Sequence, residues 1–248
     1  MRTNGEPDPV IPEVTLRIPG TWSGPQEFFG RLPAECRPTD KGFMLADGSE
    51  FELHVLPADE EFPSIFADSC PKLPTESERE RIENYTVSIC LIGSGGSLEA
   101  ARQVMAAAAA VLATGGAGVF VDNSGIAHGA TDWLTLCDDA EEGGVYWAFI
   151  STVRSDEELY SIGMHILGCR DAIVPSTGND EYDSRTLHSF LGYTAFSGAK
   201  INDGDVVGDA VLPTFHAHML PDERVPAGTA MFNPYGRWRL VPVDTQQN

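Results

Sequence analysis

The feature that most constrains the fold is an alternating segment followed directly by a long amphipathic one. Apolar residues recur at every second position in residues 85–92, which predicts a half-buried β-strand. Residues 97–114 carry apolar side chains at the spacing of an amphipathic helix. Glycines at 93–96 and 115–116 separate these elements, and residues 118–122 again resemble a strand. The segment therefore predicts a β-α-β unit against which the rest of the chain must pack.

Turn residues and periodicity predict further elements. An Asp-Gly turn between two β-rich runs predicts a hairpin over residues 43–56. Helices are predicted at residues 126–137, 159–167 and 185–196. Strands are predicted at residues 145–153, 172–174, 210–219 and 236–243. Because these strands are half polar, we expect a mainly antiparallel sheet with helices on one face. The predicted fold is two-layer α+β with ferredoxin-like units.

A change of composition predicts where the chain divides. Residues 57–80 carry several prolines and many charges, which is typical of a connector. The sequence therefore predicts an N-terminal β-rich module, residues 1–78, and a C-terminal α+β domain, residues 79–248.

The chain is strongly acidic, with 37 aspartates and glutamates against 16 lysines and arginines and a formal net charge of −21. This charge repels nucleic-acid phosphates and anionic lipid, so neither nucleic acid nor a membrane is an expected partner. No apolar run approaches the roughly 18 residues of a membrane span. The first residues also lack the apolar core of a secretory signal. We therefore expect a cytoplasmic protein whose partner is another protein, and a basic one.

The negative charge is concentrated in one interval. Between Arg102 and Arg154 there is no lysine or arginine. The candidate binding residues of this interval are acidic: Asp122, Asp138, Asp139, Glu141 and Glu142. A second set lies near the C-terminus: Arg237, Trp238 and Arg239. Arginine beside an aromatic residue is typical of binding hot spots. The alternative for this second set is an edge strand whose arginines neutralise nearby carboxylates.

Four residues are candidates for catalysis or metal binding. His128 and Asp132 are four apart in a predicted helix, where such a pair can orient an imidazole for acid–base catalysis or form a simple surface ion pair. His216 and His218 alternate on a predicted strand, so both side chains leave the same face, as two ligands of zinc would. A third ligand would have to come from His128, Asp132 or Asp122.

Other motifs are incomplete. Residues 93–97 lie between a strand and a helix, where phosphate-binding loops occur, but the third fingerprint glycine is absent. Glu99 would also repel a phosphate at that helix end. The five cysteines form no C-x-x-C pair and are predicted to be reduced thiols. The chain contains neither a Gly-x-Ser-x-Gly elbow nor a His-Glu-x-x-His motif. No cofactor is expected.

Two short motifs carry a resemblance to a known family. They are Gly163-Met164-His165-Ile166-Leu167-Gly168, with Asp171 shortly after, and Asp203-Gly204-Asp205-Val206-Val207-Gly208. From about residue 85 to residue 245 the chain resembles a family of uncharacterised bacterial cytosolic proteins, a domain of unknown function. The resemblance implies no catalytic residues, and the first 80 residues fall outside it.

The leading hypothesis is a non-enzymatic protein-binding module, with an antitoxin-like or immunity-like role as one concrete form, because an acidic surface suits a basic toxin. The competing hypothesis is a metal-dependent hydrolase that uses His216 and His218, with His128 or Asp132 as a further ligand or base. A third hypothesis is a small-molecule sensor that uses the turn at residues 93–97.

Overall fold

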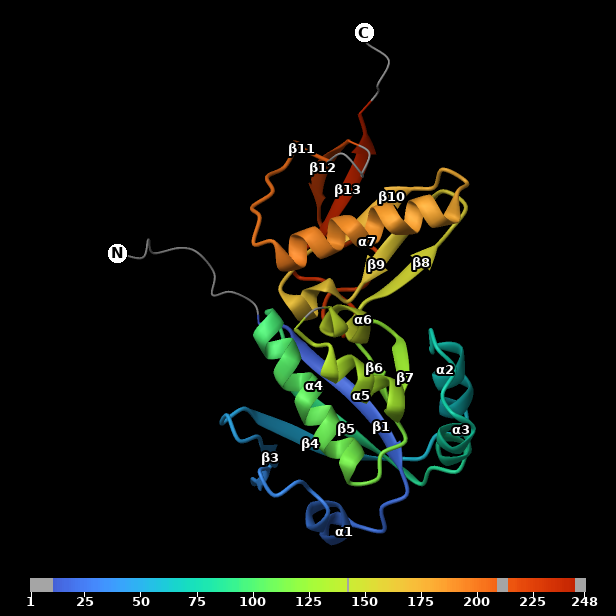
Figure 1. Ribbon diagram of the computed structural model, residues 1–248, viewed down its shortest axis with the longest axis vertical. Coiled ribbons are helices and arrows are strands. Elements are labelled where there is room, and N and C mark those ends of the chain that lie inside the picture. Colours follow the sequence, from blue (N-terminus) through green and yellow to red (C-terminus); the bar gives the residue numbers. More distant parts are fainter. Residues whose placement is uncertain (1–10, 142, 209–213, 244–248) are drawn as a thin grey trace, which may run out of the picture.

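A computed structural model describes residues 11–141, 143–208 and 214–243 of the 248-residue chain. Within these residues the chain forms one seven-stranded and one six-stranded sheet, called sheet A and sheet B. The sheets lie end to end along the long axis of the molecule, and sheet A contains the N-terminal half of the chain (Figure 1).

Sheet A contains the predicted β-α-β unit. Its strands in spatial order are β2 (Arg37–Pro38), β3 (Gly42–Met44), β4 (Glu50–Pro57), β5 (Val87–Ser94), β1 (Glu13–Gly20), β6 (Gly118–Val121) and β7 (Ile126–Gly129). All neighbouring pairs are antiparallel. Strands β5 and β6 therefore run parallel on either side of β1, and helix α4 (Leu98–Ala113) connects them. This is the split form of the unit, in which another strand lies between the two.

Helix α4 begins where the sequence predicts. The Ser97 hydroxyl accepts a hydrogen bond from the amide of Ala100 at 3.1 Å, which satisfies one of the free N–H groups of the first turn. The buried face of the helix, including Val104 and Met105, joins one hydrophobic cluster with Leu16 of β1. Burying each of these side chains stabilises the fold by about 1.5–3 kcal/mol.

Two shorter helices lie against the other face of sheet A. They are α2 (Phe62–Asp68) and α3 (Glu76–Glu83). Phe62 and Phe66 of α2 form a second hydrophobic cluster with Phe120 of β6, and the three rings lie 5.6 to 6.4 Å apart between centroids. Sheet A therefore carries helices on both faces.

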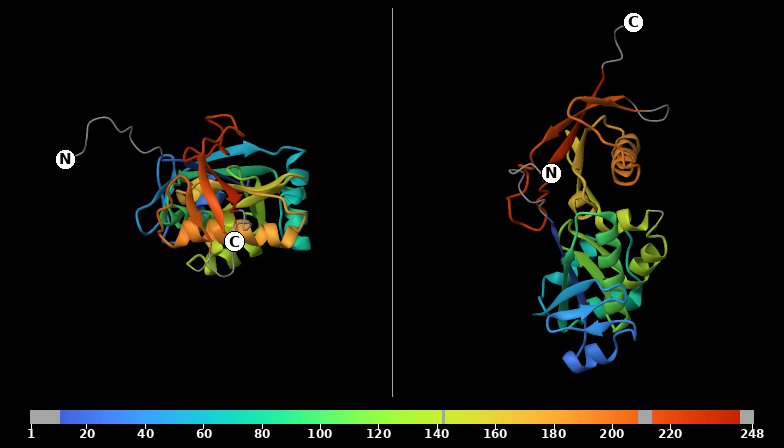
Figure 2. Two further views of the ribbon diagram at one scale, coloured as in Figure 1. Left: turned by 90° about the horizontal axis from the view of Figure 1, so that it is seen from above. Right: turned by 90° about the vertical axis from the view of Figure 1, so that its left-hand side faces the viewer.

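Sheet B is formed by the later part of the chain. Its strands in spatial order are β11 (Asp205–Val207), β12 (Phe215–Leu220), β13 (Arg237–Pro242), β10 (Asp171–Pro175), β9 (Glu158–Ile162) and β8 (Ser151–Arg154). Only β10 and β13 form a parallel pair. Helix α7 (Asp180–Phe196) covers one face of this sheet (Figure 2). Strands β8 and β11 are its two edges.

The chain thus has the predicted mixed α+β fold with mainly antiparallel sheets. The expected division at residues 78 and 79 falls within sheet A, because strands β1–β4 share that sheet with β5–β7. The change from sheet A to sheet B lies between β7 and β8. Buried side chains of both sheets belong to one continuous hydrophobic cluster.

Two predicted elements between residues 126 and 153 are partly wrong. The predicted helix at 126–137 is strand β7 followed by helix α5 (Ala130–Asp138), and Gly129 makes the corner between them. The predicted strand at 145–153 is helix α6 (Gly144–Phe149) followed by strand β8. Short apolar runs fit the helical and the strand period equally well, so tertiary packing decides between them.

The predicted helix at 159–167 is also wrong. Its first half is strand β9, and its second half is the short 3₁₀ helix η1 (Met164–Leu167). Gly163 separates the two halves with a φ of 111°, a conformation that favours glycine. Of the strand predicted at 210–219, β12 accounts for the end, and residues 209–213 lie outside the described residues.

Candidate functional site

A cleft of about 510 Å³ lies where the last strand of sheet A approaches the edge strand of sheet B. We call it the inter-sheet cleft. Its lining comprises Asp68, Ser69, Cys70, Pro71, Ser124, Gly125, Ile126, His128, Asp132, Leu136, Trp147, Ile150, Ser151, Thr152, Val153 and His188. Its volume falls in the range of typical ligand pockets. The cleft brings together the predicted pair His128 and Asp132 with an aromatic residue that the sequence did not single out.

His128 and Asp132 form a hydrogen-bonded pair, although they do not share a helix. His128 is on β7 and Asp132 is in the first turn of α5, and 2.9 Å separates His128 Nδ1 from Asp132 Oδ2. The other carboxylate oxygen accepts a hydrogen bond from Lys72 Nζ at 3.1 Å. The hydrogen bond from His128, supported by Lys72, lowers the pKa of Asp132. The carboxylate therefore stays charged and fixes the orientation of the imidazole.

The chemistry available to this pair is limited by burial. The Asp132 carboxylate can only accept, so His128 donates to it from Nδ1, and among the described residues His128 Nε2 has no hydrogen-bond partner. The His128 side chain is only 2% exposed, so a substrate cannot reach it in this conformation. Burial, together with the charges of Asp132 and Glu78, raises the pKa of the nearby Cys70 thiol to about 12. Cys70 is therefore not a thiolate nucleophile at neutral pH.

Trp147 is the exposed aromatic residue of the cleft. Of the four tryptophans in the chain, Trp22, Trp133 and Trp238 are at most 6% exposed, whereas Trp147 is 50% exposed. Its ring lies 4.9 Å from that of His188, between centroids. Burial lowers the pKa of His188, which favours the neutral imidazole. Periodicity alone gave no sign of this exposure, because residue 147 falls inside an apolar run that fits a buried strand.

The predicted acidic binding residues divide into two groups. Asp122 pairs with Arg17 of β1 at 2.7 Å, and burial raises its pKa despite that partner. Asp138, Asp139 and Glu141 are exposed at and just beyond the end of α5, whereas Glu142 lies outside the described residues. The exposed acids at the end of α5 can therefore meet a partner directly, whereas Asp122 could do so only if its ion pair with Arg17 were broken.

The C-terminal candidates mostly support the fold. Trp238 is 6% exposed and the Arg237 side chain only 2%. Arg237 donates from Nε to Asp222 at 2.6 Å. Only Arg239 remains half exposed, and it pairs with Glu158 at 3.3 Å. The arginines neutralise nearby carboxylates, as the alternative expected, but β13 is not an edge strand, because it pairs with both β12 and β10.

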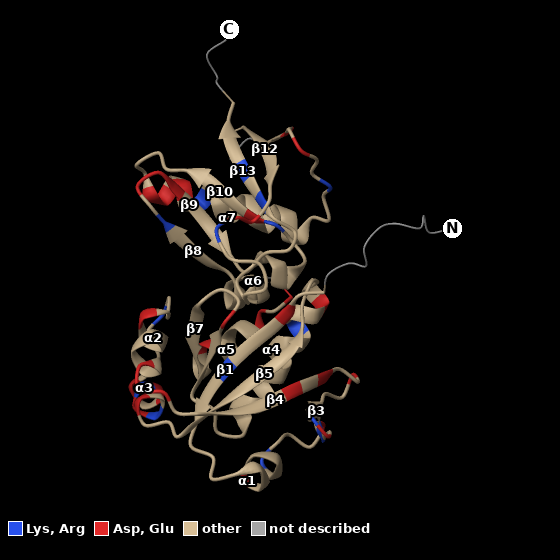
Figure 3. Ribbon diagram, turned by 180° about the vertical axis from the view of Figure 1, so that it is seen from behind, with Lys and Arg blue, Asp and Glu red and all other residues tan. Residues whose placement is uncertain are grey.

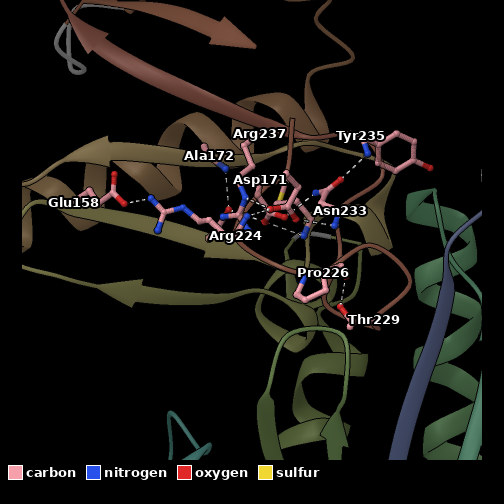
Figure 4. A network of polar contacts seen from close by, with 12 residues as sticks. Glu158, Asp171, Ala172, Arg224, Pro226, Thr229, Asn233, Tyr235 and Arg237 are labelled. Carbon is pink, nitrogen blue, oxygen red and sulfur yellow. Dashed lines mark hydrogen bonds and ion pairs between the residues drawn. The ribbon is translucent and has the colours of Figure 1, made fainter. Parts of the chain in front are cut away.

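Arg237 belongs to a buried polar network that joins β10 and β13 to the loop between β12 and β13 (Figure 4). Asp222 also accepts from the Asn233 amide at 2.9 Å, and the Asn233 side chain donates to Asp171 at 2.7 Å. Burial raises the pKa of Asp171 to about 6, although hydrogen bonds from Asn233 and Ser161 oppose this rise. The network is closed to solvent, so its role is to hold the loop against the sheet.

The two predicted metal ligands lie far along the other sheet. His216 and His218 both project from β12, with ring centroids 6.1 Å apart. His216 Nδ1 lies 3.4 Å from the Gly204 carbonyl oxygen, and His218 Nδ1 lies 3.7 Å from the Asp203 carboxylate. Within residues 11–141, 143–208 and 214–243, no group of three or more His, Cys, Asp or Glu side chains is placed to hold a metal ion.

The glycine turn at 93–97 is closed by internal contacts. The Gly95 amide donates to the Pro12 carbonyl at 2.8 Å and the Gly96 amide to the Ile166 carbonyl at 2.9 Å. A Cβ at Gly168 would lie 2.3 Å from the Gly96 carbonyl oxygen, so η1 packs directly against the turn. These amides are therefore not free to bind a phosphate.

The comparisons with known proteins add no identity: no family model, no curated protein and no solved structure matches the chain. Among the described helices, none is both long enough and apolar enough to cross a membrane.

Proposed function

We propose that this protein is a non-enzymatic, cytoplasmic protein-binding module that holds its partner at the inter-sheet cleft. The partner is a basic protein, and neutralisation of a basic toxin is one concrete form of this role. We also propose that the protein belongs to the uncharacterised bacterial family that it resembles. That family implies no catalytic residues, which is consistent with a non-enzymatic role.

The observation that carries the proposal is the exposure of Trp147. A half-exposed tryptophan leaves on the order of 100 Å² of apolar surface in water, worth about 2–3 kcal/mol if a partner buried it. Tryptophan is also among the residues most enriched in binding hot spots. In the same cleft, Leu136, Ile150 and Val153 provide apolar neighbours.

Charge around the cleft supports a basic partner. Asp68 lines the cleft and is exposed. Three further acidic residues are exposed near the C-terminal end of β8: Asp156, Glu157 and Asp180. Figure 3 shows acidic residues gathered at the N-terminal end of α7, to which Asp180 belongs. Rim charges of one sign accelerate association with a partner of the opposite sign and select against partners of like sign.

The metal-dependent hydrolase receives less support from the geometry. His216 and His218 are on β12, whereas His128 and Asp132 line a cleft beside β7 and β8. Neither His128 nor Asp132 is grouped with them as a shared set of ligands within the described residues. The proposal therefore assigns no catalytic role to these four residues.

Photo-cross-linking in the cells that make the protein tests the proposal. A benzoylphenylalanine placed at Trp147 is expected to give a covalent adduct with one basic polypeptide. The same group placed at Tyr193, an aromatic residue 48% exposed on α7 but outside the cleft lining, is the matched control. Equal adducts at both positions, or none at Trp147, would contradict the proposed site.

Once that partner is in hand, Trp147→Ala is expected to weaken its binding at least about 30-fold, the effect of a hot-spot residue worth about 2 kcal/mol. Calorimetric titration measures this, and Tyr193→Ala is expected to bind within about threefold of the wild type. A Trp147→Ala protein that binds normally would show that the exposed ring has no part in recognition.

A further inference from the structure

We infer that the partner contributes an extended segment that pairs with β8 as an additional strand of sheet B. This inference rests on the proposed function and specifies how recognition occurs. Within the part of the chain that the structure describes, strand β8 is an edge of its sheet and pairs only with β9. Edge strands present unpaired N–H and C=O groups, and adding a strand is a recurrent way in which proteins bind peptides.

The register shows which groups of β8 are free. The Ser155 amide donates to the Glu158 carbonyl at 2.9 Å, so residue 155 faces β9. Because backbone groups alternate in direction along an antiparallel strand, Ser151 and Val153 also point their amides toward β9. Thr152 and Arg154 therefore direct their N–H and C=O groups outward.

The outward edge is accessible. Thr152, Val153 and Arg154 are all exposed, and Thr152 and Val153 also line the inter-sheet cleft. An added strand at this edge would therefore lie next to the cleft and near its exposed tryptophan. The edge and the exposed ring belong to one surface.

Three common protections of an edge strand, proline, lysine and a bulge, are absent from β8, which spans four residues. Proline, a bulge or an outward lysine commonly blocks such edges, but residues 151–154 contain no proline or lysine, and the pairing with β9 is unbroken over all four residues. The one charged residue, Arg154, is drawn toward α7, where its Nη1 lies 3.1 Å from Asp180 and 3.3 Å from Asp183.

Charge and surface chemistry define the segment that would pair here. Its alternate side chains would face either the α7 side of sheet B, where Asp180 and the other acidic residues of the first turn of α7 lie, or the opposite side, toward which Val153 projects. A strand in which lysine or arginine alternates with apolar residues satisfies both. The occupant is therefore a basic, alternating, extended segment of a partner protein.

Binding of synthetic peptides to the full chain tests this inference by fluorescence polarisation. The probe is a labelled decapeptide of alternating lysine and valine. There are three companion peptides: one carries glutamate in place of lysine, and the other two keep the lysine sequence and carry N-methyl groups on either the odd-numbered or the even-numbered backbone nitrogens. We expect the lysine peptide to bind, the glutamate peptide to bind at least tenfold more weakly, and N-methylation on one register to weaken binding at least tenfold.

A matched pair of variants examines the protein side. Thr152→Pro removes an outward N–H without removing a bond to β9, and edge strands accept proline at such positions. We expect it to weaken the lysine peptide at least tenfold, whereas Thr152→Val, which keeps the amide, should bind within about threefold of the wild type. Unchanged thermal melting confirms that both variants are folded, and the N-methylated peptides decide the question if Thr152→Pro does not fold.

The outcomes separate this inference from the proposed function. If Trp147→Ala abolishes binding while N-methylation and Thr152→Pro leave it unchanged, the cleft binds protein but not by strand addition. If the wild-type protein binds none of the peptides, or prefers the glutamate peptide, the basic-strand inference is overturned. The cross-linking result at Trp147 stands independently of either finding.

Discussion

Replacing Arg237 with methionine is expected to lower the free energy of unfolding by about 3–5 kcal/mol, the usual effect of removing one partner of a buried ion pair. Asp222 would remain with a fully buried side chain and without the Nε–H donor that now lies 2.6 Å away. Urea-induced unfolding measures the loss. Arg239→Met is the matched control: it removes an arginine two positions along the same strand whose ion pair is half exposed, and we expect a change within about 1 kcal/mol.

A double variant distinguishes the effect of leaving the Asp222 carboxylate buried without its ion-pair partner from the effect of losing the packing of the Arg237 side chain. Arg237→Met combined with Asp222→Asn removes both charges and is expected to be more stable than Arg237→Met alone. The amide oxygen of residue 222 can still accept from the Asn233 backbone amide, which now donates to Asp222. A single variant that loses less than 1 kcal/mol, or a double variant that is less stable than the single one, would show that the ion pair does not hold this loop.

Two buried groups are expected to give opposite dependences of stability on pH. Burial raises the pKa of Asp171 from 3.8 to about 6 and lowers the pKa of His165 from 6.5 to about 4. Folded Asp171 holds its proton more tightly than the unfolded chain does, so its contribution is present at low pH and is lost as the pH rises through about 6. Folded His165 holds its proton less tightly, so its contribution is present above pH 6.5 and is lost as the pH falls toward 4.

Substitutions at these two positions should therefore change the dependence of the free energy of unfolding on pH in opposite directions. A pKa change of roughly two units corresponds to about 3 kcal/mol, so each effect is large. Relative to the wild type, Asp171→Asn should gain stability as the pH rises from 4 to 6, and His165→Gln should lose it. Urea unfolding at pH 4, 5, 6 and 7 measures both, and comparison with the wild type cancels the other titrating groups. Profiles parallel to that of the wild type would show that neither group has the shifted pKa.

Local periodicity was sufficient where an element is long or has clear ends. The 85–122 segment was predicted as β-α-β and forms β5, α4 and β6. Ser97 caps the start of helix α4, and two glycines follow its end at Thr114. Both ends are therefore defined by residues close to them in the sequence. The same reasoning failed at residues 126–137, 145–153 and 159–167, where a strand and a helix each occupy only a few residues. A run of that length does not cover enough turns to distinguish the two periods.

The pair of His128 and Asp132 was predicted from a helix over residues 126–137, whereas helix α5 begins only at Ala130. A spacing of four brings side chains together on one helix face, but here the corner at Gly129 brings a strand residue to 2.9 Å from a residue of the next helix. The proximity was predicted correctly and its cause was not. This distinction affects function, because the strand places His128 in a buried position where a surface helix would have left it exposed.

By itself, the sequence determined the acidic charge, the mixed α+β class and the helix of the β-α-β unit, because these depend on composition or on residues a few positions apart. Only the tertiary structure decided which surface a partner can use. Trp147 is exposed and β8 is an edge because of how two sheets pair and pack. Asp171 meets Asn233 from 62 positions away in the chain. Such contacts are set by strand register and by which faces are buried, and local sequence patterns carry little information about either.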